Sequence, residues 1–175
     1  KFLGKTTVLC KDTPAFIANR VGVYSIMALL HLVEKMELTV EEVDKFTGPA
    51  LGRPKSATFR TTDVVGLDTM IKVAKGLYDN CPDDKAHELF KLPTYVEKMD
   101  ANKWLGDKTG QGFYKKTKSA DGKTEILALD LKTLEYRPQE KVKSATLDLT
   151  KSIENVKDRM KVFAAGKDKV GELFR

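Results

Sequence analysis

The stretch AFIANRVGVYSIMALLHLVEKM, residues 15–36, decides the fold class. Almost every position in it is apolar or a good helix former. A helix that is apolar nearly all round lies at the centre of a bundle or in a subunit interface. We therefore expect a core helix here, with the rest of the chain packed around it. Apolar residues at helical spacing mark one face of this helix, namely Val23, Ile26, Met27, Leu30 and Val33.

The segments on either side of the core helix carry strand and capping patterns. Thr6–Lys11 is short, apolar and β-branched, and the sequence DTP at 12–14 then breaks it. This pattern predicts an extended arm that enters the core helix. On the other side, Thr39 and Glu42 have the spacing of a capping box, which predicts a second helix from Val40.

Turn residues divide the middle of the chain into further short helices. Breakers crowd the sequence GPALGRP at 48–54, which predicts a loop, and Ser56 is expected to cap the short helix after it. An apolar repeat of three and four residues follows Gly66 and predicts an amphipathic helix that ends before Pro82. Residues 83–90 begin with two aspartates and are expected to form another helix.

The character of the sequence changes after Gly112. Asp121-Gly122 between extended runs is a strong signal for a hairpin turn. Helical periodicity returns over 144–165, and 168–174 is expected to add a last turn or two. We therefore predict a small β-hairpin appendage followed by one long helix. The expected strand-like runs are 113–116, 125–129 and 134–137.

Composition places the chain among soluble globular proteins. It has 175 residues, 41% hydrophobic and 32% charged, enough for one compact unit with a buried core. The apolar run Val21–Val33 is too short for the ~20 residues that a bilayer span requires. The net charge of +6 is spread among interleaved acidic residues, which favours a solvated surface over a nucleic-acid partner. Two distant cysteines suggest a reduced cytoplasmic protein, and the first residue, Lys1, suggests an excised fragment.

The sequence contains few candidates for catalysis. Its two histidines, His31 and His87, lie in no recognisable acid–base setting, and a structural role is the expected one. We find no G-x-G-x-x-G or P-loop motif, and no cluster with the spacing of metal ligands. The glycine-rich sequence GDKTGQGFY at 106–114 could offer N–H groups to a phosphate, but a tight turn that orders the following aromatics is the alternative.

Three stretches together resemble the C-terminal domain of NAD-dependent 3-hydroxyacyl-CoA dehydrogenases. They are DTPAFIANR at 12–20, GRPKSATFRTTDVVGLD at 52–68 and WLGDKTGQGFY at 104–114, and the resemblance extends over about Lys5–Lys116. The middle stretch and the sequence Tyr136-Arg137-Pro138 are similar to the long multifunctional members, which also carry an enoyl-CoA hydratase domain. Whether such a domain accompanies this chain stays open.

The resemblance implies roles for four residues. In this family the asparagine of the first stretch, Asn19 here, contacts the reacting end of the substrate, an acyl-CoA. An amide can orient a hydroxyl or ketone oxygen without changing its charge. The alternative for Asn19 is a helix cap. Lys55, Ser56 and Phe59 would be wall residues of the acyl pocket. NAD would be bound mainly by an upstream nucleotide-binding domain absent from this chain, so the fragment alone is expected to be inactive.

The resemblance also implies an architecture and partners. We expect an all-α bundle like the C-terminal domains of 6-phosphogluconate-dehydrogenase-like enzymes, with the β-hairpin appended. Residues 1–116 would form the dehydrogenase domain, and 117–175 an extension that leads towards a second helical repeat. The expected partners are the upstream domain and either a second copy or that repeat, with no nucleic acid and no membrane span. A helical nucleic-acid-binding module and a pure interaction domain remain the rival functions.

Overall fold

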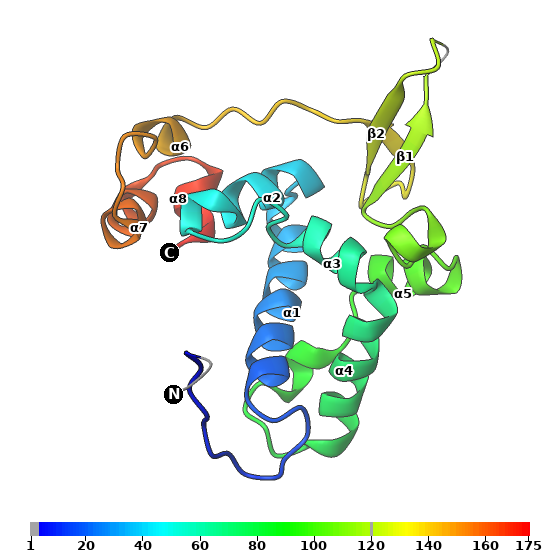
Figure 1. Ribbon diagram of the computed structural model, residues 1–175, viewed down its shortest axis with the longest axis vertical. Coiled ribbons are helices and arrows are strands. Elements are labelled where there is room, and N and C mark those ends of the chain that lie inside the picture. Colours follow the sequence, from blue (N-terminus) through cyan, green and yellow to red (C-terminus); the bar gives the residue numbers. More distant parts are fainter. Residues whose placement is uncertain (1–3, 120) are drawn as a thin grey trace.

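The computed structural model describes residues 4–119 and 121–175, and most of its regular structure is helical. The α-helices are α1 (Ala18–Met36), α2 (Val40–Thr47), α3 (Phe59–Val65), α4 (Leu67–Asn80), α5 (Thr94–Ala101), α6 (Ala145–Leu149), α7 (Val156–Ala165) and α8 (Lys169–Leu173). Short 3-10 helices are η1 (Pro49–Leu51), η2 (His87–Phe90) and η3 (Asp107–Thr109). The mainly helical class expected from the sequence is confirmed. In Figure 1, α1 runs through the middle of the molecule, with α2 across one end and α4 alongside.

The central helix α1 is the core helix that the apolar pattern predicts. It packs against α4 and η2, which cover the face predicted to be buried. It begins at Ala18 rather than Ala15, because Ala15 and Phe16 have positive φ angles of 63° and 49°, which cannot continue a right-handed helix. Its buried residues are Val23, Met27, Leu29, Leu30 and Val33.

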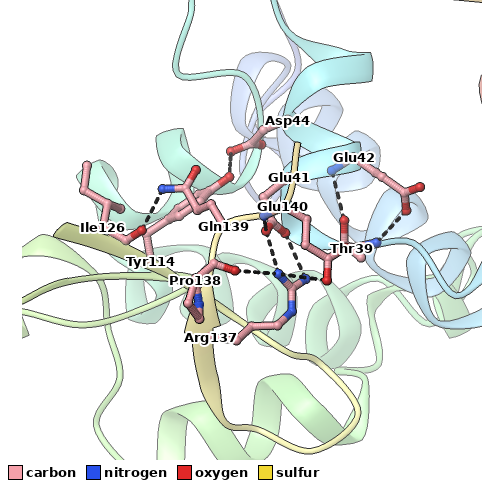
Figure 2. A network of polar contacts seen from close by, with 10 residues as sticks. All are labelled: Thr39, Glu41, Glu42, Asp44, Tyr114, Ile126, Arg137, Pro138, Gln139 and Glu140. Atoms are coloured by element: carbon pink, nitrogen blue, oxygen red, sulfur yellow. Dashed lines mark hydrogen bonds and ion pairs between the residues drawn. The ribbon is translucent and has the colours of Figure 1, made fainter. Parts of the chain in front are cut away.

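The capping box expected at the start of α2 is present. The Glu42 N–H donates to the Thr39 hydroxyl at 3.2 Å, and the Thr39 N–H donates to the Glu42 carboxylate at 2.9 Å (Figure 2). Two donors that no helical carbonyl could reach are thereby satisfied. The prediction of a helix from Val40 is confirmed.

The prediction that Ser56 caps α3 is wrong. Ser56 lies before the helix and accepts a hydrogen bond from the Thr61 hydroxyl at 2.8 Å. The residue at the N-cap position is Thr58, whose side chain makes no cap hydrogen bond. A carboxylate from α2, that of Asp44, accepts the first N–H groups of α3 instead, which a local sequence pattern does not reveal.

The amphipathic helix expected after Gly66 is α4, which ends at Asn80 as predicted. The helix expected over 83–90 is wrong, since only the short η2 forms there. The Asp84 carboxylate accepts the Ala86 N–H at 2.8 Å and pairs with Arg20, so it stabilises a turn that competes with a helix.

The appendage is a three-stranded antiparallel sheet rather than a hairpin. Its strands β1 (Tyr114–Lys118), β2 (Thr124–Leu129) and β3 (Tyr136–Pro138) lie in the order β1-β2-β3. The third strand-like run supplies β3, which extends the expected hairpin by pairing Tyr136 with Leu129. Strand β1 continues across the expected domain boundary at residue 116, and the division at that point stays a prediction.

The long helix expected over 144–165 is wrong, because the structure has two helices there, α6 and α7. Local side-chain hydrogen bonds explain the break. The Thr150 hydroxyl donates to the Leu147 carbonyl at 2.8 Å just after α6 ends, and the Asn155 side chain accepts the Lys157 N–H at 2.8 Å to begin α7. The turn expected over 168–174 is α8.

A strap of stretched chain, residues 139–143, joins β3 to α6 (Figure 1). At one end, Arg137 forms an ion pair with the buried Glu41 of α2, whose carboxylate also accepts the Glu140 N–H at 2.8 Å (Figure 2). At the other end, the Asp168 carboxylate accepts the hydroxyls of Ser144 and Thr146, each at 2.7 Å. Both ends of the strap are therefore fixed to the helical part.

Candidate functional site

Two of the sequence stretches singled out above meet at Asp63, a residue of α3. Its carboxylate is 1% exposed and accepts the backbone N–H groups of Phe113 and Tyr114, at 2.9 and 2.8 Å. A Cβ atom on Gly106 would lie 2.2 Å from the Asp63 carbonyl oxygen, and one on Gly112 would lie 2.1 Å from its carboxylate. The glycines are thus required for the loop to approach α3, as the tight-turn alternative predicted.

A second carboxylate, that of Asp44, joins α2 to the same loop. It accepts the N–H groups of Thr58, Phe59 and Arg60, at 2.6–3.0 Å, and so caps α3. It also accepts the Tyr114 hydroxyl at 2.9 Å (Figure 2). One side chain therefore fixes three segments of the chain relative to one another.

Burial changes the acidity of both carboxylates. Desolvation raises the pKa of Asp63 to about 6, although hydrogen bonds from the two backbone N–H groups partly oppose the rise. Desolvation likewise raises the pKa of Asp44 above its ordinary value, against the opposing effect of its four hydrogen bonds. These groups were missed from the sequence. The signal that could have found them is an acid placed among apolar helix positions, as Asp63 is beside Val64 and Val65.

Beside this junction lies a cavity of about 510 Å³, a volume in the range of small-molecule sites. Arg60 and Asp107 form a bidentate pair on its wall, with distances of 2.6 and 2.7 Å. Lys55 and Lys116 also line it, so the cavity has more cations than anions. Its remaining lining residues are Asp44, Gly110, Tyr114, Ile126 and Gln139.

The three residues expected in the acyl pocket differ in their burial and in their position relative to this cavity. Lys55 is exposed on the cavity wall, and Ser56 is half-buried nearby in sequence. Phe59 is completely buried, with its ring centroid 4.2 Å from that of Phe113. Phe59 is not among the residues that line the cavity, and direct contact of these three residues with a substrate stays a prediction.

Asn19 lies in the first turn of α1 and is exposed. The N-cap position belongs to Ile17, and no side-chain cap hydrogen bond is made there. This geometry removes the helix-cap alternative for Asn19. In Figure 1 the start of α1 lies away from α3, and Asn19 is not among the residues that line the cavity beside Lys55.

Large apolar side chains surround the exposed start of α1. Phe16, Ile17 and Val21 are 56%, 48% and 60% exposed. The next residue after Asn19, Arg20, pairs with Asp84 and donates to the Cys81 sulfur at 3.7 Å, which fixes this end of α1 to the turn after α4. The start of α1 therefore presents the Asn19 amide and these apolar side chains to solvent, on a helix end that Arg20 fixes.

The two histidines have structural partners. His31 lies within hydrogen-bonding distance of the carbonyl oxygens of Leu89 and Lys91, both at 3.1 Å. His87 stacks on Tyr78 and contacts its carbonyl oxygen at 2.8 Å.

Across residues 4–119 and 121–175, no group of three or more His, Cys, Asp or Glu side chains could hold a metal ion. In the same part of the chain, no helix has the length and apolar character to cross a membrane.

Comparison with known proteins gives a consistent family. A family model described as the C-terminal domain of 3-hydroxyacyl-CoA dehydrogenase matches residues 16–116. A probable 3-hydroxyacyl-CoA dehydrogenase of Bacillus subtilis is 46% identical over 172 residues, which are 98% of this chain and 21% of that protein. Another, of Deinococcus radiodurans, is 52% identical over 116 residues, 66% of this chain and 33% of that protein.

Solved structures agree with this likeness. The crystal structure of M. tuberculosis FadB2 superposes with a TM-score of 0.56 at 32% identity, covering 65% of this chain and 38% of that one. The crystal structure of (S)-3-hydroxybutyryl-CoA dehydrogenase PaaH1 from Ralstonia eutropha gives 0.54 at 28% identity, over 63% of this chain and 37% of that one. The chain thus spans about a fifth to two fifths of these four proteins.

Proposed function

This chain belongs to the 3-hydroxyacyl-CoA dehydrogenase family, and we propose that it is the substrate-binding and association part of an enzyme that oxidises 3-hydroxyacyl-CoA to 3-ketoacyl-CoA with NAD in fatty-acid β-oxidation. Because the chain spans 21% and 33% of two of its relatives, the rest of the machinery would lie in other parts of a longer protein.

The observation that carries the proposal is the placement of Asn19. Its amide is exposed at the fixed start of a 19-residue helix and makes no cap hydrogen bond. An amide both donates and accepts, so it can hold the C3 hydroxyl of the substrate and then the ketone oxygen of the product. Arg20 would keep the helix end still through its pair with Asp84. Orientation of this kind lowers the barrier without any proton transfer by Asn19 itself.

The residues of this chain do not fit NAD. The sequence has no G-x-G-x-x-G motif, and the strands of the described part form a small antiparallel sheet rather than a parallel βαβ unit. NAD would be held by an upstream nucleotide-binding domain of the longer protein, where it would supply the hydride acceptor. We also propose that the domain boundary lies between residues 116 and 117 and that the helical part has the fold of 6-phosphogluconate-dehydrogenase-like C-terminal domains. The enzyme is proposed to be cytoplasmic.

Lys55 and Ser56 complete the proposed substrate contacts, with Phe59 behind them. The cavity that Lys55 lines has a cationic excess, which suits a carbonyl or phosphate oxygen of an acyl-CoA. Phe59 would act through the shape of that wall, because its own ring is fully buried.

A chimera tests the proposal. The B. subtilis relative would have its matching 172 residues replaced by this chain, and NADH formation from a 3-hydroxyacyl-CoA would be followed by absorbance. We expect turnover by the chimera and none by this chain alone. A chimera that folds and binds NAD but does not oxidise the substrate would contradict the proposal, and so would turnover by the isolated chain above a heat-killed control.

A further inference from the structure

A second cavity lies away from the site described above, between α2, η1 and the C-terminal helices. Its volume is about 530 Å³, and the strap and both α6 and α7 contribute to its wall. Five cationic side chains line it, against the single acid Asp148. The cations are Lys45, Lys141, Lys143, Lys151 and Arg159.

Arg159 is held in place without a counter-charge. Its guanidinium donates to the carbonyl oxygens of Pro49 at 3.1 Å and Glu154 at 3.3 Å. Its Nε atom is buried and has no hydrogen-bond partner within residues 4–119 and 121–175. In that part of the chain Arg159 forms no salt bridge, so its positive charge is fixed by neutral groups and uncompensated. A planar guanidinium held in this way is suited to phosphate oxygens.

The lysines extend this positive charge around an apolar floor. Lys151 is paired with Asp148 at 2.7 Å, which accounts for the one acid in the cavity. Lys45, Lys141 and Lys143 have no ion-pair partner among the residues that the structure describes. The floor between them is apolar and is formed by Pro49, Ala50, Val142 and Leu147.

We propose that this cavity binds the diphosphate of an adenosine diphosphate group, with the base on the apolar floor. A single phosphate would leave most of the cations uncompensated, whereas the larger negative charge of a diphosphate compensates several of them. The volume is in the range of small-ligand pockets, which favours one nucleotide over a strand of nucleic acid. The ligand could be a free nucleotide or the adenosine diphosphate end of a coenzyme, and the proposal does not depend on the role of Asn19.

Calorimetric titration of the whole chain tests this. We expect ADP to bind and adenosine not to bind, and the affinity for ADP to fall by about tenfold or more between about 50 and 200 mM salt. Tighter binding of CoA than of ADP would identify a coenzyme end as the ligand, and equal affinity would identify free nucleotides. Either result supports an adenosine diphosphate site.

Two charge-reversed variants locate the binding. The double variant Lys141→Glu/Lys143→Glu should weaken ADP binding by about tenfold or more, since both side chains are exposed and line the cavity. The matched control is Lys72→Glu/Lys75→Glu on α4, which makes the same charge change outside the cavity and should alter affinity less than about twofold. Equal losses in the two variants, or equal binding of ADP and adenosine by the unchanged chain, would overturn the proposal. Circular dichroism of each variant confirms that it is folded.

Discussion

The guanidinium of Arg137 donates to both carboxylate oxygens of Glu41, at 2.8 and 3.2 Å, although 96 residues separate the two in sequence. Burial alone would raise the pKa of Glu41, but the hydrogen bonds from Arg137 and the Glu140 N–H hold it below its ordinary value. The pair therefore fixes the sheet and the strap to α2 through a carboxylate that water cannot easily reach.

Arg137→Ala should lower the free energy of unfolding by about 2–4 kcal/mol, because it leaves Glu41 buried without its cation. Urea unfolding measures this loss. The matched control is Lys132→Ala, which removes an exposed pair with Glu37 and should cost at most about 1 kcal/mol. Equal effects of the two substitutions would contradict this account of the Glu41 pair.

Asp63 should make stability depend on pH in a defined direction. Its pKa is raised from 3.8 to about 6 in the folded chain, so the protonated form is favoured by folding. Its contribution is therefore complete below about pH 4 and is lost as the pH rises through 6, a change of about 3 kcal/mol. Asp63→Asn cannot titrate. The unfolding free energy of the unchanged chain should rise relative to this variant as the pH falls from 7 to 4. A constant difference between the two would show that the Asp63 pKa is not raised.

Two glycines of the same loop should respond differently to alanine. Gly106→Ala would place a Cβ atom 2.2 Å from the Asp63 carbonyl oxygen at a φ angle of +100°, and we expect a loss of about 3–5 kcal/mol. Gly110 has a φ angle of +76°, and a Cβ atom added there would meet nothing within 4 Å, so Gly110→Ala should cost only about 1–2 kcal/mol. Thermal unfolding distinguishes them, and similar losses would argue against close packing on Asp63.

Asn19→Ala, made in the chimera, should lower kcat/KM by roughly ten- to a thousandfold. The melting temperature should hardly change, since Asn19 is exposed and caps nothing. Asn19→Asp is the sharper variant, because a carboxylate cannot donate to a ketone oxygen. A folded and fully active Asp variant would exclude the proposed orienting role.

An apolar stripe on α1 should make the chain associate with itself. Ile17, Val21, Tyr24 and Leu32 recur at helical spacing and are 37–60% exposed. We expect light scattering to find a dimer or larger species at micromolar concentration, and Val21→Lys to shift it towards the monomer. Val8→Lys adds the same charge in the exposed arm and serves as the control. A monomeric unchanged chain at high micromolar concentration would rule out this association.

The sequence predicts those elements whose determinants are local. The apolar period of α1, the Thr39–Glu42 capping box and the repeat that forms α4 each lie within one segment, and each prediction is confirmed. Local patterns fail to predict an element when its cap or turn depends on a residue that is distant in sequence or on a competing side-chain hydrogen bond. Asp44 takes the capping role expected of Ser56, and Asp84 turns the chain where a helix was expected from its acidic start.

The candidate site is predictable to a similar degree. The resemblance identifies Asn19 and Lys55, and both are exposed, as contact with a substrate requires. It does not indicate that Asp44 and Asp63 join the loop at 106–114 to α3, because hydrogen bonds across 50 to 70 residues leave no spacing pattern in the sequence. Nor does it distinguish Phe59, a core residue, from the residues that face the cavity.

The contacts of α2 have a consequence for the order of folding. This eight-residue helix is too short to persist alone, and its side chains contact Tyr114, Arg137 and Lys169, 70, 96 and 127 residues further along the chain. Closing such long loops is slow, because their entropy is lost before any contact compensates for it. We expect α2 to become ordered late, after α1 and α4 have met. Substitutions at these partners should then speed unfolding and leave the rate of folding nearly unchanged.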